Sequence, residues 1–431
     1  MQAFKEFQQG CTIFDVVLEL YLSLNMLPKL ISDNSITDLN ALTTTGQKFT
    51  YDTDFVYNEK MSDEITKKNY KFRTGDFNVP QYKFLPNGQY LLCQIDNGSS
   101  AYFFGSFIGY SENNTSSKGI IKLNQDLTID KSFNVGTGFN IVIYNGEGII
   151  QQPDGKLIAF GSFTSYNGTS SVRIIRLNTD GSIDNSFVTG SGFYGSSINY
   201  TASASIDSLG NIIVPGRYFQ YNGVNTPMAL LTKLNSNGVM DMTFSATTSF
   251  NNVTTCSLIN SDDSMFIGGQ FSSFSGVSAN RIIKLKSNGT IDNSFTIGTG
   301  FNNSVNKFLR IFGETSFYAF GNFTTYKGIS ANRIIKLNLD GTIDNSFTSG
   351  TGFNNNTSPA HIIWTNKLLI NGSFTSYNGI PSIKNIILNS NGTIFKSFTT
   401  EYDVMFTIGN KLYGSKPNGY LKLIMTYVAP I

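Results

Sequence analysis

The chain has 431 residues and carries 31 basic and 29 acidic side chains, for a formal net charge of +2. Charged residues make up 14% of the chain, against about 25% in ordinary soluble proteins, and aromatic residues make up 13%. This composition excludes a charge-driven disordered chain and a coiled coil, and the small net charge gives no long-range attraction to nucleic acid or to an anionic membrane.

The first 55 residues have helical rather than strand-like periodicity. Apolar residues recur at the i, i+3, i+4 and i+7 spacing of an amphipathic helix from Phe14 to Tyr21, and the same spacing returns after Pro28. Short strands expected near residues 11–13 and 48–51 would flank these helices. The sequence therefore predicts a small α+β module at 1–55.

A module of this size cannot bury a large core, so part of its apolar helical face is expected to remain free for a partner. The candidate docking residues on that face are Phe14, Val17, Tyr21, Leu27 and Leu30. Residues 56–63 form a polar linker between this module and the rest of the chain.

A repeat of about fifty residues runs through most of the remaining sequence. The segment GSFTSYNG at 161–168 recurs as GNFTTYKG at 321–328 and again as GSFTSYNG at 372–379. Looser copies begin at Gly105, Gly216 and Gly269. These six segments mark six repeats, which we number one to six in chain order.

A second signature follows each copy of the first. The segment RIIRLNTDGSIDNSF at 173–187 returns almost unchanged at 281–295 and 333–347. Between its two halves stands an Asn-Gly or Asp-Gly pair, which is typical of a type I′ hairpin turn. We therefore expect each repeat to form four short strands, and four-stranded units of this length are typical of the blades of a β-propeller. A β-helix, whose rungs are much shorter, is the alternative.

The strands of repeat four are expected at 252–259, 264–271, 281–286 and 290–295. The tail of the chain, 402–428, has material for three strands only, and residues 64–75 resemble the missing fourth. The sequence thus predicts a mainly β protein with a seven-bladed propeller at 64–431, in which residues 64–75 complete the last blade and remove an exposed sheet edge.

These signatures resemble the delta-60 family of propeller repeats, which carry a G-x-F-x-x-Y-x-G segment, a strand ending in R-L-N and then D-G-x-x-D-x-S-F. The resemblance extends over residues 105–398 and implies a propeller, a fold that hosts many functions. Repeat three departs most from the pattern, with GRYF at 216–219, and repeat six has Phe395 where the other repeats have Asp.

The segments TIFDVVLELY at 12–21, LISDN at 30–34 and GQKF at 46–49 resemble the LysM-type domain found in phage tail proteins. The chain has Leu22 where a glycine is usual and lacks the usual glutamine. Such modules stand at the start of virion proteins in phages that infect Bacteroidetes, including crAss-like phages. The resemblance therefore implies a component of a virion tail.

The inventory of reactive groups is small. The chain has three cysteines and one histidine, so neither a zinc site nor a Ser-His-Asp triad has the residues it needs. We expect no catalytic residues, no cofactor and no metal site. His361 and Trp364, three positions apart in the first strand of repeat six, are the candidate ligand-binding residues.

Three repeated patterns have both a functional and a structural interpretation. The Asn178, Asp180 and Asp184 pattern suits a calcium loop or a hairpin turn, and the turn is favoured because a calcium-binding glutamate is missing. Phe163 and Tyr166, with their equivalents, suit sugar stacking or core packing, and packing with the Tyr hydroxyl tied to a loop is favoured. The strand-end arginines suit a basic ring or pairing with an Asp184-type carboxylate, and pairing is favoured. These arginines and their equivalent lysine are Arg173, Arg281, Arg333 and Lys384.

We expect a non-enzymatic structural component of a bacteriophage tail, assembled in the host cytoplasm in multiple symmetric copies. Its 1–55 module would dock to other tail proteins, and its propeller would be a rigid platform, with a host surface glycan as a further candidate partner. Neither nucleic acid binding nor membrane insertion is expected. The alternatives are a bacterial surface or secreted propeller that binds carbohydrate or protein, and a carbohydrate-active enzyme with paired carboxylates.

Overall fold

The computed structural model describes a set of residues spread over the whole chain, and all the regular structure among them is β. The chain divides into two compact units, residues 1–81 and 82–431. No helix in the described part of the chain has the length and apolar character needed to cross a membrane. The described residues are 2–7, 47–52, 91–96, 98–105, 119–140, 148–194, 204–244, 250–364, 366–399, 404–415 and 421–427.

The first unit contains one described antiparallel pair, β1 (Gln2–Phe7) with β2 (Gln47–Asp52). The strand expected at 48–51 is confirmed as β2, and β1 is an additional strand that the sequence did not predict. The register sets Gln2 opposite Asp52 and Phe7 opposite Gln47. Four of the expected features lie outside the described residues. They are the strand expected at 11–13, the linker expected at 56–63, the closing strand expected at 64–75 and the residues expected on a helical face, Phe14, Val17, Tyr21, Leu27 and Leu30.

The second unit contains a succession of antiparallel sheets, which we number one to seven in chain order. Sheets one to six carry repeats one to six. Their strands are: sheet one, β3 (Leu91–Asp96), β4 (Ser100–Gly105) and β5 (Ile120–Asn124); sheet two, β6 (Gly148–Gln151), β7 (Leu157–Phe160) and β10 (Ile174–Leu177); sheet three, β11 (Phe193–Tyr194), β12 (Ser205–Ile206), β13 (Ile212–Tyr221) and β14 (Val224–Leu234); sheet four, β15 (Thr254–Ile259), β16 (Met265–Gly269) and β19 (Ile282–Leu285); sheet five, β20 (Val305–Leu309), β21 (Ser316–Gly321) and β24 (Ile334–Asn338); sheet six, β25 (Thr357–Ile363), β26 (Lys367–Gly372), β29 (Asn385–Asn389) and β30 (Ile394–Ser397); sheet seven, β31 (Val404–Ile408), β32 (Lys411–Ser415) and β33 (Leu421–Thr426).

Four small hairpins follow the middle strands of sheets two, four, five and six. Each holds the Tyr or Phe of the G-x-F-x-x-Y segment in its first strand, and in sheet three the long strands β13 and β14 take its place. The hairpins are β8 (Ser165–Tyr166) with β9 (Thr169–Ser170), β17 (Ser273–Phe274) with β18 (Val277–Ser278), β22 (Thr325–Tyr326) with β23 (Ile329–Ser330), and β27 (Ser376–Tyr377) with β28 (Ile380–Pro381).

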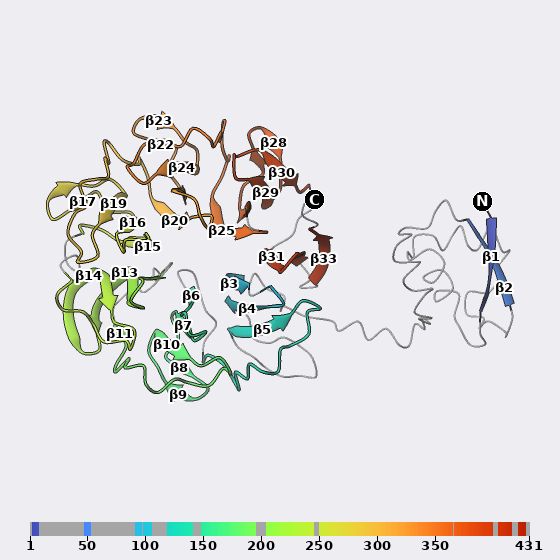
Figure 1. Cartoon of the computed structure of the whole chain (residues 1–431), viewed down its shortest axis with the longest axis horizontal. Helices are drawn as coiled ribbons and strands as arrows, with labels where there is room; N and C mark the ends of the chain where they lie inside the picture. The colour runs from blue at the N-terminus through green and yellow to red at the C-terminus, as the bar shows by residue number, and fades with distance from the viewer. Residues whose placement is uncertain are drawn as a thin grey trace. The chain divides into compact units, whose positions relative to one another are not determined.

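Within the second unit the sheets stand around a common centre (Figure 1). Strands β3, β6, β15, β20, β25 and β31 lie nearest to that centre, and the small hairpins lie toward the outside. Sheet seven packs against sheet one, where Phe406 meets Phe103 edge to face at 4.8 Å and the Tyr413 hydroxyl donates to the Gln125 carbonyl. The two ends of the array therefore meet through a shared apolar core.

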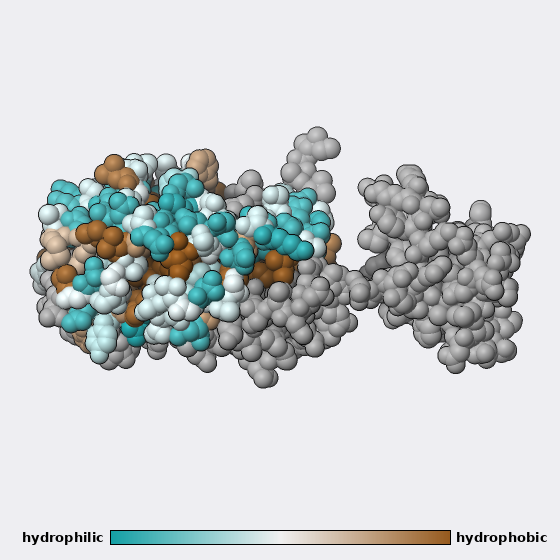
Figure 2. Space-filling view, turned by 90° about the horizontal axis from the view of Figure 1, so that it is seen from below, coloured by the Kyte–Doolittle hydropathy of each residue, from teal (hydrophilic) through white to brown (hydrophobic). Residues whose placement is uncertain are grey.

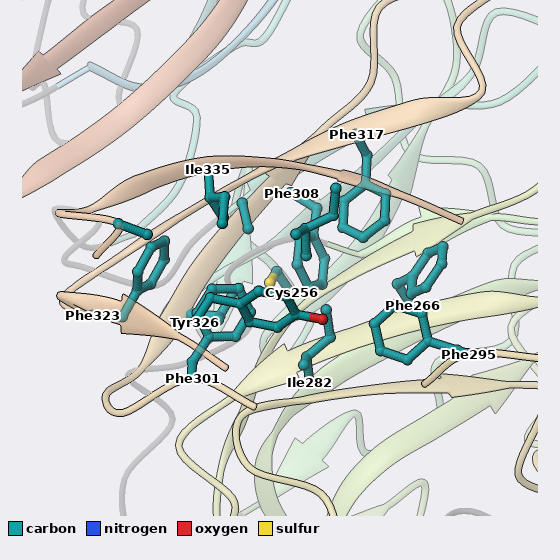
Figure 3. Close-up of a cluster of buried hydrophobic side chains, with 14 residues drawn as sticks. Cys256, Phe266, Ile282, Phe295, Phe301, Phe308, Phe317, Phe323, Tyr326 and Ile335 are labelled. Atoms are coloured by element: carbon teal, nitrogen blue, oxygen red, sulfur yellow. The ribbon is translucent and has the colours of Figure 1, made fainter. Parts of the chain in front are cut away.

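Apolar side chains from consecutive sheets fill the space between them. Figure 3 shows the junction of sheets four and five. There the ring centres of Phe266 and Phe317 lie 4.4 Å apart, and Cys256 packs against Phe308. Burial raises the pKa of the Cys256 thiol to about 12, so this cysteine is an inert core residue. Because both faces of a sheet meet neighbours, the strands are apolar on both sides, as in β21, where every residue is buried.

The fourth strand of most repeats is shorter than expected. In five repeats the segment after the turn joins the third strand through a single bridge, as between Leu285 and Ile291, where a strand at 290–295 was expected. The reason is the Asp that follows, since its side chain accepts a hydrogen bond from the backbone two residues on and so diverts the chain from the ladder; in repeat four, Ser294 donates to Asp292 at 2.9 Å. Repeat six has Phe395 instead, and there the fourth strand, β30, forms.

The Asn-Gly and Asp-Gly turns differ from the expected type I′. The Gly289 amide donates to the Lys286 carbonyl, and the Lys286 amide donates to the Thr290 carbonyl. Gly289 has φ +86°, whereas Asn288 is not among the residues with positive φ. This pattern is a type I turn followed by a left-handed glycine, the three-residue hairpin loop, so only the glycine needs positive φ.

Candidate functional site

An ion pair recurs in sheets one, two, four and five, between a cation on the third strand and an Asp that follows the next turn. In sheet two the Arg176 guanidinium lies 2.8 Å from Asp184, which also pairs with Lys156 at 2.8 Å. Although burial favours the neutral acid, hydrogen bonds from Lys156 and Ser186 and the charge of Arg176 hold the pKa of Asp184 well below its ordinary value. The equivalent pairs are Lys122 with Asp130, Lys284 with Asp292, and Lys336 with Asp344.

The Asp of each ion pair also accepts a hydrogen bond from the backbone two residues on, so each of these carboxylates has two structural roles. In repeat two, Asp184 accepts hydrogen bonds from both the amide and the hydroxyl of Ser186. Asp180 likewise accepts two bonds from Ser182. This use of the oxygens supports the turn interpretation over a calcium loop, and no group of three or more His, Cys, Asp or Glu gathers among the described residues.

The Tyr of the G-x-F-x-x-Y segment is hydrogen-bonded to the Asn-Gly or Asp-Gly turn of the same repeat, which we call the locked turn. Tyr326 is wholly buried and its hydroxyl donates to the Gly341 carbonyl at 2.9 Å. Tyr166 and Tyr377 donate in the same way to the carbonyls of Gly181 and Gly392. The core-packing interpretation of this segment, with its hydroxyl tied to a loop, is confirmed, and these rings do not offer a stacking surface to a sugar.

Each locked turn also contacts the preceding sheet. The amides of Asn134, Thr296 and Thr348 donate to the carbonyl of the residue before the turn glycine of the next repeat, as in Thr296 to Asp340 at 2.9 Å. A Cβ at Gly341 would lie 2.7 Å from the Thr296 carbonyl oxygen. Neighbouring sheets are therefore joined by backbone hydrogen bonds as well as by apolar contacts.

The strand-end arginines do not pair with carboxylates as expected. Arg173 and Arg333 donate to the carbonyls of Phe193 and Phe353, at 2.9 and 2.8 Å, on the segment that leads into the next sheet. Arg173 and Arg333 have φ angles of +67° and +68°, and this left-handed backbone turns each side chain toward that neighbour. The Asp184-type carboxylate is instead taken by the cation three residues later.

Repeat six has Ile387 in place of the cation and Phe395 in place of the acid, and Phe395 lies among other aromatic residues. The Trp364 ring stacks on Tyr427 at 4.7 Å with 6° between the ring planes, and Phe395 stands edge-on to both rings at 6.2 Å. The Lys367 ammonium lies 5.3 Å from the centre of the Phe395 ring. We call Trp364, Phe395 and Tyr427 the aromatic corner; it joins sheet six to sheet seven.

His361 and Trp364 have different neighbours despite their closeness in sequence. His361 lies in β25, where it pairs in register with Leu369, and the nearby charge is that of Lys307 on β20. Burial, with a smaller contribution from Lys307, lowers the pKa of His361 to about 3. Trp364 follows the strand and packs toward sheet seven. Their role in ligand binding stays a prediction.

The sequence did not predict that Phe395 and Tyr427 contact Trp364. Phe395 was visible as a departure from the repeat, because five other repeats carry Asp at that position. Tyr427 lies 63 positions from Trp364 and outside any repeat, so no sequence signal connects the two. The docking residues of the first unit lie outside the described residues, and the docking role stays a prediction.

The surface of the described part mixes hydrophilic residues with small groups of hydrophobic ones (Figure 2). The exposed apolar residues include Phe312, at the tip of the loop between β20 and β21, and Phe395, which is 37% exposed. Val277, Ile329 and Ile380 occupy the same exposed position of three successive small hairpins.

A family model described as a domain of unknown function (DUF5122) beta-propeller matches residues 152–187, 261–295 and 318–347. These matches fall on repeats two, four and five and end at the Phe of the D-N-S-F segment. No curated protein matches the chain.

Several solved structures are similar to the chain at low identity. The computationally designed Ika8 protein is 9% identical over 81% of this chain and 99% of its own, with a TM-score of 0.46. A protein of unknown function from Bacteroides caccae is 13% identical over 60% and 81%, with a TM-score of 0.33. A catalytically inactive virginiamycin B lyase from Staphylococcus aureus, solved with quinupristin, is 9% identical over 78% and 96%, with a TM-score of 0.33. With the repeats, the succession of sheets around one centre and the family match together, the chain is a β-propeller repeat protein.

Proposed function

We propose that this protein is a structural, non-catalytic component of a bacteriophage tail. The observation that carries the proposal is the use of polar side chains within the propeller. The recurring carboxylates are held in ion pairs and turns, and the recurring Tyr hydroxyls lock the glycine carbonyls. A unit whose functional groups are committed to its own fold suits a rigid platform, and the resemblance of the 12–21 segment to tail-associated LysM-type modules supports the tail.

In this proposal the propeller has seven blades and residues 64–75 add the fourth strand to the last one. The composition of sheet seven supports this arrangement, because it has three described strands, and among the described strands β33 pairs with β32 alone. An unpaired edge strand is open to association with another chain, and covering it protects the fold.

The 1–55 module would attach the protein to the tail through Phe14, Val17, Tyr21, Leu27 and Leu30. Tail assemblies are symmetric, so the same apolar face would dock onto equivalent neighbours in several copies. The protein would be assembled into the particle in the host cytoplasm, with other tail proteins as its partners.

The test is incorporation of the full chain into particles. Tagged wild type and a Phe14→Asp, Tyr21→Asp variant are expressed during infection, particles are purified by density, and the tag is quantified. We expect wild type in the particles and a loss of the double variant, whereas the matched control Ile329→Ser on the propeller is retained. Wild type that is absent from particles and found on the bacterial surface or in the medium would instead support the surface or secreted binding propeller.

A further inference from the structure

We propose that the aromatic corner, with Lys367, is a carbohydrate-binding subsite. It deepens the platform role proposed above by naming a ligand class, but it can be tested on the purified chain without particles. The corner is built from three segments, the end of β25, the strand β30 and the end of β33. Its members are brought together only by the fold.

The other repeats serve as internal controls for what the fold requires at this place. Five repeats carry an Asp at the Phe395 position, and four of these pair with a cation on the third strand. Repeat six carries Ile387 and Phe395 instead of the cation and the acid. Ile387 is wholly buried, whereas Phe395 leaves 37% of its surface in water.

Closing the junction of sheets six and seven does not require the exposed ring. Leu369, Ile387, Phe398, Met405 and Leu412 already form a closed core there, and each is at most 6% exposed. An apolar ring that stays in solvent beside a complete core adds little to burial. Its presence is better explained by something that binds on it.

The groups around the ring suit a sugar. The negative face of an aromatic ring attracts the weakly positive C–H groups on the flat face of a pyranose. The Lys367 ammonium and the exposed amides of Asn366 and Asn410 supply donors and acceptors for ring hydroxyls. Lys367 at present donates to Asn366 at 2.9 Å, a surface contact that a ligand hydroxyl can replace.

A sugar also fits the size of the corner better than a protein does. One partly exposed ring with three polar neighbours is far smaller than the roughly 1,000 Å² that a specific protein interface needs. Contacts of this size give affinities in the millimolar range, about 4 kcal/mol. Several symmetric copies on one particle would raise such a weak affinity through multivalency.

Trp364 is the single tryptophan of the chain, so its fluorescence reports on this site alone. The full chain is screened on a glycan array, and galactose, mannose, N-acetylglucosamine and glucuronic acid are then titrated while Trp364 emission is followed. We expect a saturable change with at least one sugar. Glucuronic acid binding more tightly than the neutral sugars would assign a direct contact to Lys367.

Two variants and one control separate binding from folding. Phe395→Asp, which installs the residue of the other repeats, and Lys367→Gln should each weaken binding about tenfold or more without lowering the melting temperature. Phe312→Ser, which removes an exposed ring elsewhere, should leave binding unchanged. The proposal is overturned if the array and the titrations give no response, if Phe395→Asp binds as wild type does, or if it only lowers the melting temperature. None of these results depends on incorporation into particles.

Discussion

Sheets five and six share the G-x-F-x-x-Y segment and the locked turn, yet they differ at the positions that face the next sheet. Sheet five carries Phe320, Ile334, Lys336 and Asp344 where sheet six carries Asn371, Asn385, Ile387 and Phe395. Sheet six therefore has two amide side chains where sheet five has apolar ones, and two apolar side chains where sheet five has an ion pair. Asn371 is 4% exposed, and neither its amide nitrogen nor its oxygen has a hydrogen-bond partner among the described residues.

The neighbour explains where these changes fall. Sheet five is followed by another repeat, whose turn supplies a carbonyl for its side chains, as when Tyr318 donates to Ser390 at 2.7 Å. Sheet six is followed by sheet seven, whose last described strand is β33, and residues 402–428 carry no D-x-S-F segment. The polar residues of the repeat are thus retained where another repeat follows, and they are replaced at the junction between sheets six and seven. A side chain at this junction that does not contribute to the ion pair, such as Phe395, is available for another role.

The largest expected effect comes from converting part of sheet two into sheet six. Asp184→Phe leaves Arg176, which is 4% exposed, with no carboxylate partner, and should destabilise the protein by about 3–5 kcal/mol. The double variant Asp184→Phe, Arg176→Ile copies sheet six and removes both charges, so it should recover at least about 1 kcal/mol of that loss. Denaturant unfolding measures both.

A double variant no more stable than the single one would show that the ion pair itself stabilises sheet two beyond the removal of a lone charge. It would also show that sheet six requires sheet seven beside it to accept an apolar pair.

The next effect separates backbone strain from contact between sheets. Gly341→Ala should destabilise by about 3 kcal/mol, because alanine resists φ +87° and its Cβ would lie 2.7 Å from the Thr296 oxygen. Gly328 has φ +79° with open space around it, so Gly328→Ala should cost only the strain, about 1 kcal/mol. Equal losses in thermal unfolding would mean that the turn does not press on the preceding sheet.

The sole histidine gives sheet six a pH dependence between pH 6.5 and about 5 that sheet five lacks. The unfolded chain binds a proton at His361 below pH 6.5, whereas burial and Lys307 lower the pKa of His361 to about 3 in the folded state. The free energy of unfolding should therefore fall as the pH drops from 6.5 towards about 3, by up to about 1.4 kcal/mol for each pH unit. Asp184 and its equivalents, whose pKa values are lowered, add losses only at still lower pH.

In His361→Leu the decline between pH 6.5 and about 5 should be much smaller than in wild type, because no other histidine titrates there. Unfolding free energies across this range measure the difference. A variant with the wild-type slope would show that His361 takes up its proton in the folded protein as easily as in the unfolded chain.

The propeller could be predicted from sequence because its signals are local and repeated. A turn glycine, a Tyr fifteen positions before it and an Asp three positions after it, as in Tyr326, Gly341 and Asp344, recur often enough to set the strands in order. The shortened fourth strand was missed because the Asp side chain competes with the ladder, which a period-two pattern does not reveal. The type of turn was missed because an Asn-Gly pair suits two kinds of hairpin loop.

The aromatic corner is the opposite case. It depends on Tyr427 reaching Trp364 across two sheets, and neither residue belongs to the repeat signature. The replacement of Asp by Phe395 indicated that this position is unusual, but it did not indicate which residues Phe395 contacts. Long-range contacts outside a repeat need the register of the sheets before they can be assigned.

The smallest expected effect tests whether the locked turn works alike in sheets five and six. Tyr377→Phe removes the hydroxyl that donates to the Gly392 carbonyl at 3.0 Å and leaves that buried acceptor without the bond, which should cost about 1–2 kcal/mol. In sheet five the Gly341 carbonyl accepts from Tyr326 and also from the Lys327 ammonium at 2.8 Å. Tyr326→Phe should therefore cost less, about 0.5–1 kcal/mol, because Lys327 keeps the carbonyl satisfied. In a Lys327→Asn background, which installs the residue of repeat six, Tyr326→Phe should reach the cost seen for Tyr377→Phe. Denaturant midpoints measure all four variants, and an unchanged difference in that background would place its origin in the packing of the two rings.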